Sequence, residues 1–214
     1  MDRDSWLAIL KQHRAIAVIR APSLTAGFAM AQAVVQAGFR LIEITWASDC
    51  PSELVARLRQ TVPPDCYVGS GTVLSCQAMQ EAVAAGAQFC FSPHTDQELI
   101  NLAHKLEIPV IPGALTPTEI ARAWQLGASS VKVFPSQALG GPAYIRHLQG
   151  PLGHIPLVPT GGVTVEAGCA FLEAGAIAIG LSSSLFPKLL VAHQDWPSIQ
   201  ARSRTFLTTL RNHL

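Results

Sequence analysis

The sequence has few charged residues, and several common kinds of segment are absent from it. Asp, Glu, Lys and Arg make up 14% of the 214 residues, where ~25% is usual, and the formal net charge is only +1. Long basic runs are also missing, which disfavours a nucleic-acid or anionic membrane surface. No stretch approaches the ~18 apolar residues of a membrane span, and the acidic N-terminus resembles neither a secretory nor a transit peptide. We therefore expect a cytoplasmic protein that acts on a small molecule, with no nucleic-acid or membrane partner.

The spacing of the cysteines and histidines and the scarcity of lysine are informative. The five cysteines are odd in number, widely spaced and without a C-x-x-C pair, so they predict reduced thiols rather than a disulfide framework. The seven histidines are equally scattered, and no metal site is expected. Only four of the 15 basic residues are lysines, at positions 11, 105, 132 and 188. Three of them lie in polar, helical contexts where a solvated charge is the default, which makes Lys132 the exception.

The length favours a single domain over residues 1–214, at ~150 residues per domain. A short β-branched apolar run, a small turn and a longer Ala-, Leu- and Gln-rich stretch recur at intervals of roughly 20 to 25 residues, which is typical of βα units. The apolar runs are Ala15 to Ile19, Arg40 to Thr45, Tyr67 to Val68, Gln88 to Phe91, Pro109 to Ile111, Ser130 to Phe134, Leu157 to Pro159 and Ile177 to Ile179.

Helix boundaries follow from Ser, Thr and Pro at the starts of the intervening stretches and from Gly at several ends. The expected starts are Ser23, Pro51, Ser75, Thr95, Thr116, Pro142, Thr164 and the segment 182–184, and the expected ends are Gly38, Gly86, Gly127 and Gly175. A further helix over Asp4 to Arg14 precedes the first strand, and a closing helix covers Pro197 to Leu214.

Eight evenly spaced short strands predict a single-domain α/β fold, a (β/α)8 TIM barrel with an extra N-terminal helix. A doubly wound sheet is the less favoured alternative, because no G-x-G-x-x-G follows the first strand. In such a barrel function concentrates at the C-terminal ends of the strands. Polar residues in or after the strands are therefore the candidates for function.

Glu43 is the only acid embedded in a strand-like apolar run. Alternation places it on the same face as Leu41 and Thr45, either in the barrel lumen or in the helix layer. Burial of an unpaired carboxylate is costly and raises its pKa, and a partly desolvated acid suits proton transfer near neutral pH. The alternative is a structural acid paired with an arginine.

Lys132 lies within the apolar run from Ser130 to Phe134. An inward-facing lysine on a strand loses hydration, which favours the neutral amine, and a neutral amine attacks a carbonyl to form a Schiff base. The alternative is a lysine that only pairs with Glu43 or binds a phosphate.

Glycine-rich loops end three of the strands. The segments TGGV (160–163) and GLSSS (180–184) offer backbone amides, hydroxyls and a following helix N-terminus to an anion, and as the loops after strands seven and eight they predict a phosphate site. The segment VGSGTV (68–73) lets a ligand approach the backbone, and its Thr72 can donate to a carboxylate. Each of these loops alone would also fit a tight turn with a capping hydroxyl.

Three further strand ends contribute to the mouth. Arg20 ends the first strand, where its guanidinium can clamp an anionic substrate or form a rim salt bridge. The segments Ser92-Pro93-His94 and Pro112-Gly113 form walls, and proton transfer by His94 is the weaker hypothesis. A lysine and an acid on strands, together with a phosphate site at the same end of the barrel, are the groups that a class I aldolase uses.

At this point the sequence resembles the 2-keto-3-deoxy-6-phosphogluconate (KDPG) / 4-hydroxy-2-oxoglutarate (KHG) aldolases. The segments that carry the resemblance are AVIRAPS, AGFRLIEITW, VGSGTVLS, AGAQFCFSPH, IPVIPGALTPTE, VKVFPSQALGGPAYIRHLQGPL, LVPTGGV and GLSSSLF, and their order over about 170 residues is specific. The resemblance implies a (β/α)8 barrel that assembles as a homotrimer and needs no metal; we predict no cofactor.

The resemblance also implies roles for individual residues. It carries the Schiff-base role onto Lys132 and the acid/base role onto Glu43. The implied substrate contacts are Thr72 and Pro93, to which we add Phe134, and the implied phosphate contacts are Gly161, Gly162 and Ser183.

One departure from the family pattern bears on the substrate. Many members have an arginine four residues after the catalytic glutamate, held to bind the substrate carboxylate, and this sequence has Ala47 there. We predict that Arg20 takes its place, as in members that act on the phosphogalactonate epimer.

The predicted activity is cleavage of KDPG to pyruvate and glyceraldehyde 3-phosphate, with KHG, which yields pyruvate and glyoxylate, as a second substrate. The alternatives are a 2-keto-3-deoxy-6-phosphogalactonate (KDPGal) aldolase, a different phosphate-binding enzyme on the same scaffold, and a non-catalytic sugar-phosphate-binding barrel. A pure assembly protein is the least favoured, because the polar strand ends would then have no purpose.

Overall fold

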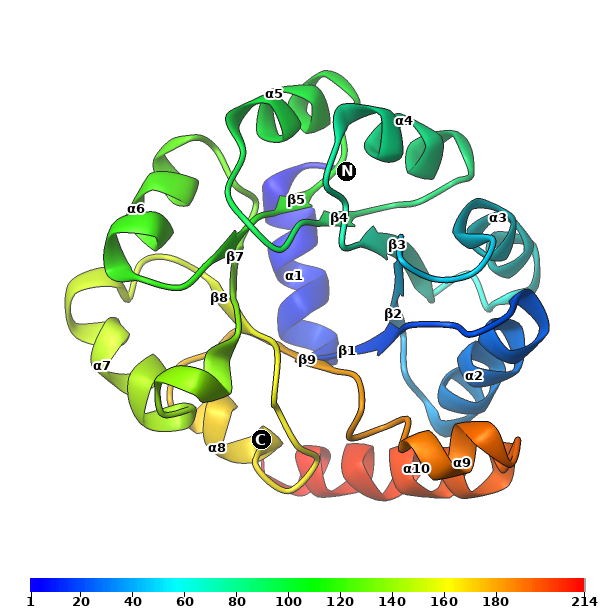
Figure 1. The fold of residues 1–214 in the computed structure, drawn as a ribbon. Coiled ribbons are helices and arrows are strands. Elements are labelled where there is room, and N and C mark those ends of the chain that lie inside the picture. Colours follow the sequence, from blue (N-terminus) through cyan, green and yellow to red (C-terminus); the bar gives the residue numbers. More distant parts are fainter. Residues whose placement is uncertain (214) are drawn as a thin grey trace.

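Short apolar strands that alternate with helices form an α/β fold in the computed structural model, which describes residues 1–213. The strands are β1 (Ala15–Ile19), β2 (Leu41–Thr45), β3 (Tyr67–Gly71), β4 (Cys90–Phe91), β5 (Val110–Ile111), β6 (Gly113–Ala114), β7 (Val131–Val133), β8 (Leu157–Pro159) and β9 (Ile179–Leu181). The helices are α1 (Arg3–His13), α2 (Leu24–Ala37), α3 (Pro51–Thr61), α4 (Cys76–Ala84), α5 (Gln97–Lys105), α6 (Pro117–Gln125), the 3-10 helix η1 (Ser136–Leu139), α7 (Pro142–Leu152), α8 (Gly168–Glu173), α9 (Lys188–Ala192) and α10 (Trp196–His213). Figure 1 shows the helices as a ring around a curved parallel sheet.

The strand pairing divides into two parallel sheets rather than the one closed ladder expected from the sequence. One has the order β5-β4-β3-β2-β1-β9 and the other the order β6-β7-β8. β5 pairs with β4, whereas β6 pairs with β7. Pro112 is the one residue between β5 and β6. On the other side, a single parallel bridge joins Thr160, after β8, to Gly180 in β9.

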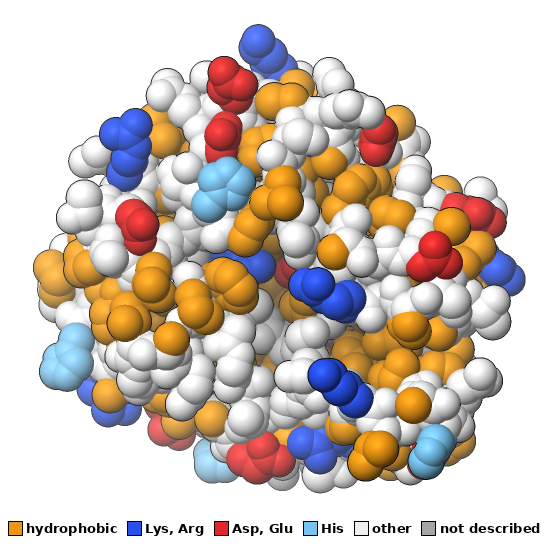
Figure 2. Space-filling view, viewed as in Figure 1, with side chains coloured by type: hydrophobic (Ala, Val, Ile, Leu, Met, Phe, Trp, Pro, Cys, Tyr) orange, Lys and Arg blue, Asp and Glu red, His pale blue; other side chains and the backbone are white. Residues whose placement is uncertain are grey.

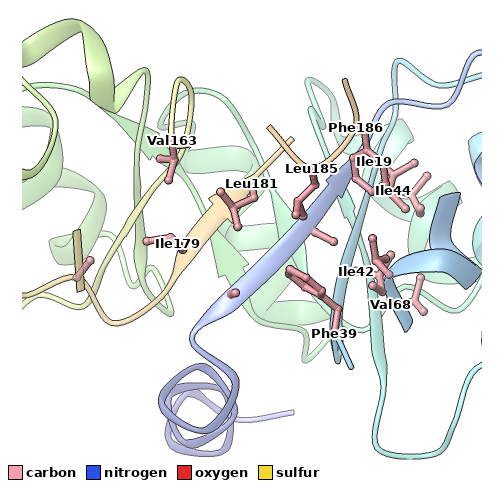
Figure 3. Packing of buried hydrophobic residues seen from close by; sticks show 14 of the residues in the cluster. Ile19, Phe39, Ile42, Ile44, Val68, Val163, Ile179, Leu181, Leu185 and Phe186 are labelled. Atoms are coloured by element: carbon pink, nitrogen blue, oxygen red, sulfur yellow. The ribbon is translucent and has the colours of Figure 1, made fainter. Parts of the chain in front are cut away.

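The two faces of the strands bury different clusters. Ile42 and Ile44 of β2 pack outward with the helices, beside residues such as Phe39 and Val68 (Figure 3). The inner face buries Ile16, Val18, Leu41, Phe89, Phe91, Ile111 and Val158. This inner cluster fills the concave side of the curved sheet.

Helix α1 closes one end of this concave side, behind the strands in Figure 1. Its Trp6 is fully buried, with its ring centroid 5.0 Å from that of Phe89 and 6.4 Å from that of Phe91. The Trp6 indole Nε1 donates to Ser130 Oγ at 3.1 Å, so burial leaves its polar group satisfied. The expected helix over Asp4 to Arg14 is thus confirmed, shifted by one residue.

Most of the expected helix boundaries are confirmed by their local hydrogen bonds. Ser23 and Ser75 accept the backbone N–H three residues on, and Thr116 forms a capping box with Glu119. The glycines expected after the helices adopt positive φ angles, namely Gly38, Gly86, Gly127 and Gly175.

Three expected helix starts are wrong. Thr95 instead donates its hydroxyl to Gly113 O, and Asp96 caps α5. Thr164 accepts Ala167 N in a single turn, and α8 begins later, at Gly168. The segment 182–184 forms a turn in which Ser184 Oγ accepts from Val165 N, and α9 begins only after Pro187.

Strand and chain ends differ from the sequence expectation by small shifts. The last strand begins at Ile179 rather than at position 177, because the ladder with β1 starts at the Ala15–Ile179 pair. The closing helix α10 is observed to residue 213, and Leu214 lies outside the described residues. Within residues 1–213 no helix is long and apolar enough to cross a membrane.

Candidate active site

Glu43 and Lys132 both point to the inner side of the curved sheet. Glu43 pairs in register with Val18, and Lys132 with Val158, and both partners belong to the inner cluster. Their chain neighbours, such as Ile42 and Val131, pack outward. The question left open by alternation, lumen or helix layer, is therefore decided in favour of the lumen for Glu43.

The two charged side chains are buried and interact electrostatically. The relative exposure is 1% for Glu43 and 4% for Lys132. Burial raises the pKa of the Glu43 carboxyl, and the positive charge of Lys132 acts in the opposite direction. Glu43 Oε1 has no hydrogen-bond partner, and no ion pair among residues 1–213 includes Glu43. A structural pairing of Glu43 with an arginine is not observed.

Aromatic rings surround the Lys132 amine. Its Nζ lies 5.7 Å from the ring centroid of Phe91 and 5.0 Å from that of Phe134. These faces exclude water while stabilising an ammonium or an iminium cation by cation–π attraction. The lysine amine therefore lies in a buried environment bordered by aromatic rings.

Gly71 makes room for the Glu43 carboxyl. A Cβ at residue 71 would overlap Glu43 Oε1, Cδ and Cγ. Gly71 ends β3, the strand that pairs with β2. This close approach requires glycine, because any side chain at residue 71 would displace the carboxyl of Glu43. Local sequence patterns contain no signal for the approach.

Replacing Gly71 by alanine is therefore expected to lower turnover by roughly 10²-fold, the loss that follows from displacing a reacting group by about 1 Å. Steady-state assays with purified protein measure the effect. Gly150→Ala is the matched control, because Gly150 is an exposed residue of α7 with open space at its Cβ position. Equal activity of the two variants would contradict the spacing role.

The other candidates follow β3, β4 and β7, at the same end of the strands. Thr72 has a φ angle of 55°, a left-handed conformation that is strained for a β-branched residue and that is found at ligand-binding positions. Pro93 and Phe134 line a common cavity of about 260 Å³ with Gly113. His94 lines the same cavity but is exposed, so nothing in its environment supports proton transfer.

The loop after β8 is built on two consecutive glycines. Gly161 and Gly162 have φ angles of 84° and 80°, which disfavour any side chain. The Gly161 carbonyl is held by Ser136 Oγ and Gln137 N. The parallel bridge between Thr160 and Gly180 engages the Gly161 amide, whereas the Gly162 N–H has no backbone acceptor outside the regular elements of the described chain and is available to an anion.

The loop after β9 brings Ser183 and Arg20 together. Both residues line a cavity of about 600 Å³, with Lys188 at its edge. Arg20 is exposed and belongs to no ion pair among residues 1–213, so a rim salt bridge is not observed. The expected helix start at 182–184 is replaced by a turn, so this cavity is lined by hydroxyls and side-chain cations rather than by a helix N-terminus at these serines.

Lys188, which the sequence assigned to a solvated helix face, is exposed at the start of α9, but sequence reasoning did not foresee that it lines the cavity of Arg20 and Ser183. The available signal was its position shortly after Ser183 in the same strand-to-helix connection. Figure 2 shows Lys and Arg side chains bordering the hollowed centre of this face, with an apolar floor beside them.

Comparison with known sequences identifies the relatives of the chain. Residues 7–202 match the family described as KDPG and KHG aldolase. The chain is 35% identical to the 2-dehydro-3-deoxy-phosphogluconate aldolase of Dickeya dadantii, over 82% of each chain. It is 34% identical to the KHG/KDPG aldolase of Escherichia coli, over 76% of each chain.

Solved structures agree with this relationship. A KDPG aldolase from Legionella pneumophila, with pyruvate captured as a covalent carbinolamine intermediate, has a TM-score of 0.86 and 26% identity, and the match covers 96% of this chain and 98% of that one. A structure described as native KDPGal has a TM-score of 0.85 and 30% identity, covering 93% and 95% of the two chains.

Proposed function

The chain belongs to the KDPG and KHG aldolase family, and on this premise we propose that it is a class I aldolase that cleaves KDPG to pyruvate and glyceraldehyde 3-phosphate. One observation carries the proposal: a buried lysine faces the same lumen as a buried carboxyl whose Oε1 has no partner. Such a pair combines covalent attachment with proton transfer.

The proposed reaction begins at Lys132. Its neutral amine attacks the C2 ketone to give a carbinolamine, and the protonated Glu43 carboxyl, favoured by burial, donates a proton to the leaving hydroxyl. Loss of water leaves an iminium cation. The new cation favours the ionised carboxylate, just as the charge of Lys132 opposes the rise in its pKa.

Cleavage follows from this change of charge. Through a water molecule, Glu43 accepts the C4 hydroxyl proton as the C3–C4 bond breaks, and the bonding electrons enter the iminium to form an enamine. Glyceraldehyde 3-phosphate is released. Protonation of C3 by the same carboxyl and hydrolysis of the iminium then release pyruvate and restore Lys132.

The remaining candidates bind the two anionic ends of the substrate. Thr72, Pro93 and Phe134 are proposed to surround the keto acid near Lys132. The loop of Gly161 and Gly162 and the hydroxyl of Ser183 are proposed to hold the phosphate, because the Gly162 amide is free and Ser183 lines an open cavity. Arg20, which the sequence predicts as the carboxylate contact, lines that same cavity, and its position beside Ser183 supports a contact with the phosphate instead.

KHG is proposed as a second substrate, because the Escherichia coli relative carries both names. Cleavage of KDPGal is a separate candidate, supported by the structural likeness to native KDPGal and by Ala47, where many family members have an arginine. A sugar-phosphate-binding barrel without activity is the non-enzymatic alternative.

A pyruvate-release assay with KDPG, KDPGal and KHG tests the function. We expect release from KDPG with kcat in the range of about 1 to 10³ s⁻¹ that is typical of enzymes. A larger kcat/KM for KDPGal would change the assigned epimer. Absence of pyruvate from all three, with sugar-phosphate binding retained, would contradict the proposed function and favour the non-catalytic alternative.

We further propose a single domain closed as an eight-stranded barrel, in which β5 and β6 are one strand interrupted by Pro112. The ring of helices and the bridge between Thr160 and Gly180 support this closure. A homotrimer in the cytoplasm is proposed from the family resemblance. In support, a related chain with 29% identity and a TM-score of 0.85, covering 94% of this chain and 73% of that one, belongs to a cage designed from symmetric oligomeric domains.

A further inference from the structure

We propose that Lys188 binds the substrate phosphate and thereby distinguishes phosphorylated from non-phosphorylated keto acids, an inference that rests on the proposed aldolase function. Lys188 is the first residue of α9 and lines the cavity of about 600 Å³ that also contains Arg20 and Ser183. The cavity thus joins two cations to the loop that is proposed to hold the phosphate.

The charges of this cavity are unbalanced. Its lining includes Arg20 and Lys188 but no Asp or Glu. The ion pairs of the described chain are Arg40–Asp65, Arg202–Glu166 and His213–Glu173, none of which involves either cation. An anionic ligand is therefore the counter-charge that the site lacks.

Apolar side chains form another part of the cavity wall. Met30 of α2, Phe186 after β9 and Val191 of α9 line the same cavity, and Figure 2 shows hydrophobic side chains at the hollowed part of this face. Both cations of the cavity and Ser183 are exposed, so a ligand can reach all three from solvent. Two cations with a hydroxyl at their side match a phosphate dianion, which has several acceptor oxygens.

Because Lys132 attacks the substrate at C2, its position fixes where the carboxylate end and the phosphate end of the substrate lie. The carboxylate is bonded to the carbon that Lys132 attacks, so it stays in the lumen beside β7. The phosphate is at the opposite end of the carbon chain. Lys188 and Ser183 follow β9, which is separated from β7 by β8, so the distal phosphate is the group that reaches them.

KDPG and KHG provide an internal control, because both have the 2-keto carboxylate and only KDPG has a phosphate. The second carboxylate of KHG is at C5, closer to the carbon that Lys132 attacks than the phosphate on C6 of KDPG. For Lys188→Met we expect the KM for KDPG to rise several-fold with kcat within twofold of wild type, the change expected from losing one solvated charge contact. The kinetic constants for KHG should remain unchanged. Lys188→Arg should restore most of the affinity for KDPG.

Lys105→Met is the matched variant, because Lys105 is an exposed lysine in the last turn of α5. If Lys188→Met equals Lys105→Met on both substrates, Lys188 is only a solvated charge and the inference is wrong. An equal loss on KDPG and KHG also overturns it, because the effect would then be independent of the phosphate.

A binding measurement separates this inference from the proposed reaction. Calorimetric titration of the wild-type chain and Lys188→Met with inorganic phosphate should show a several-fold weaker affinity in the variant, whether or not the chain releases pyruvate. Equal affinities would refute the phosphate contact. Absence of pyruvate release by the wild type, together with weaker phosphate binding by the variant, would refute the proposed activity alone.

Discussion

Lys132→Met is expected to lower pyruvate release by roughly 10³-fold or more, as removal of a covalent nucleophile does in other enzymes. Methionine approximates the length and apolar stem of lysine but has no amine. Because Lys132 is 4% exposed and its amine lies near the rings of Phe91 and Phe134, the substitution removes a buried polar group and keeps the apolar stem. The fold is therefore expected to remain intact, which circular dichroism checks.

Trapping provides a direct readout of the same residue. Borohydride reduction in the presence of pyruvate should add one reduced pyruvyl group to the peptide that contains Lys132, as measured by mass spectrometry. Lys105→Met should be modified like the wild type, and Lys132→Met should not be modified. An adduct on Lys11, Lys105 or Lys188 in the native chain would reassign the Schiff base.

Glu43→Gln is expected to reduce turnover by roughly 10²-fold or more, a typical loss for a general acid/base group. Glutamine keeps the shape of the carboxyl beside Gly71 but neither donates nor accepts the proton in the proposed steps. The loss should appear in kcat measured with saturating KDPG. Formation of the borohydride adduct should be slowed for the same reason, because loss of the carbinolamine hydroxyl needs an acid.

Stability distinguishes a catalytic from a structural role of Glu43. Burial raises the pKa of this carboxyl in the folded chain, so the folded state binds its proton more tightly than the unfolded state. The group's contribution to the free energy of unfolding is then largest below the unfolded pKa and falls as pH rises through the folded pKa. The amide of a glutamine does not titrate, so this part of the pH dependence should disappear in Glu43→Gln.

Thermal unfolding of the two proteins between about pH 4 and pH 8 measures this difference. We expect the variant to be at least as stable as the wild type near neutral pH while being far less active, the pattern of a residue kept for function at a cost in stability. Unchanged turnover together with a lower melting temperature would instead make Glu43 a structural acid.

Local chemistry explains why many elements could be predicted from the sequence. A serine or threonine hydroxyl at a helix start accepts a hydrogen bond from a backbone N–H only three residues away, as at Ser23, Ser75 and Thr116. The start at Thr95 is wrong for a reason outside this local pattern. Thr95 bonds to Gly113 O, which is distant in sequence.

The face of a strand needed the tertiary structure. Alternation put Glu43 on the opposite side from Ile42 and Ile44 but did not determine which side was enclosed. Glu43 pairs in register with Val18, which belongs to the inner cluster together with Leu41 and Phe91. This pairing places the carboxyl in the lumen. The orphaned Oε1 is likewise a property of the surroundings rather than of the residue.

The sequence by itself determined the alternation of strands and helices, the isolated lysine and acid in apolar strands, and the two glycine-rich loops, because each is set by residues within a few positions of one another. Only the tertiary structure decided that Gly71 leaves room for Glu43 and that Lys188 shares a cavity with Arg20 and Ser183. The reason is physical: these approaches depend on the register of neighbouring strands and on the packing of loops, and no local pattern encodes the distance between segments far apart in the chain.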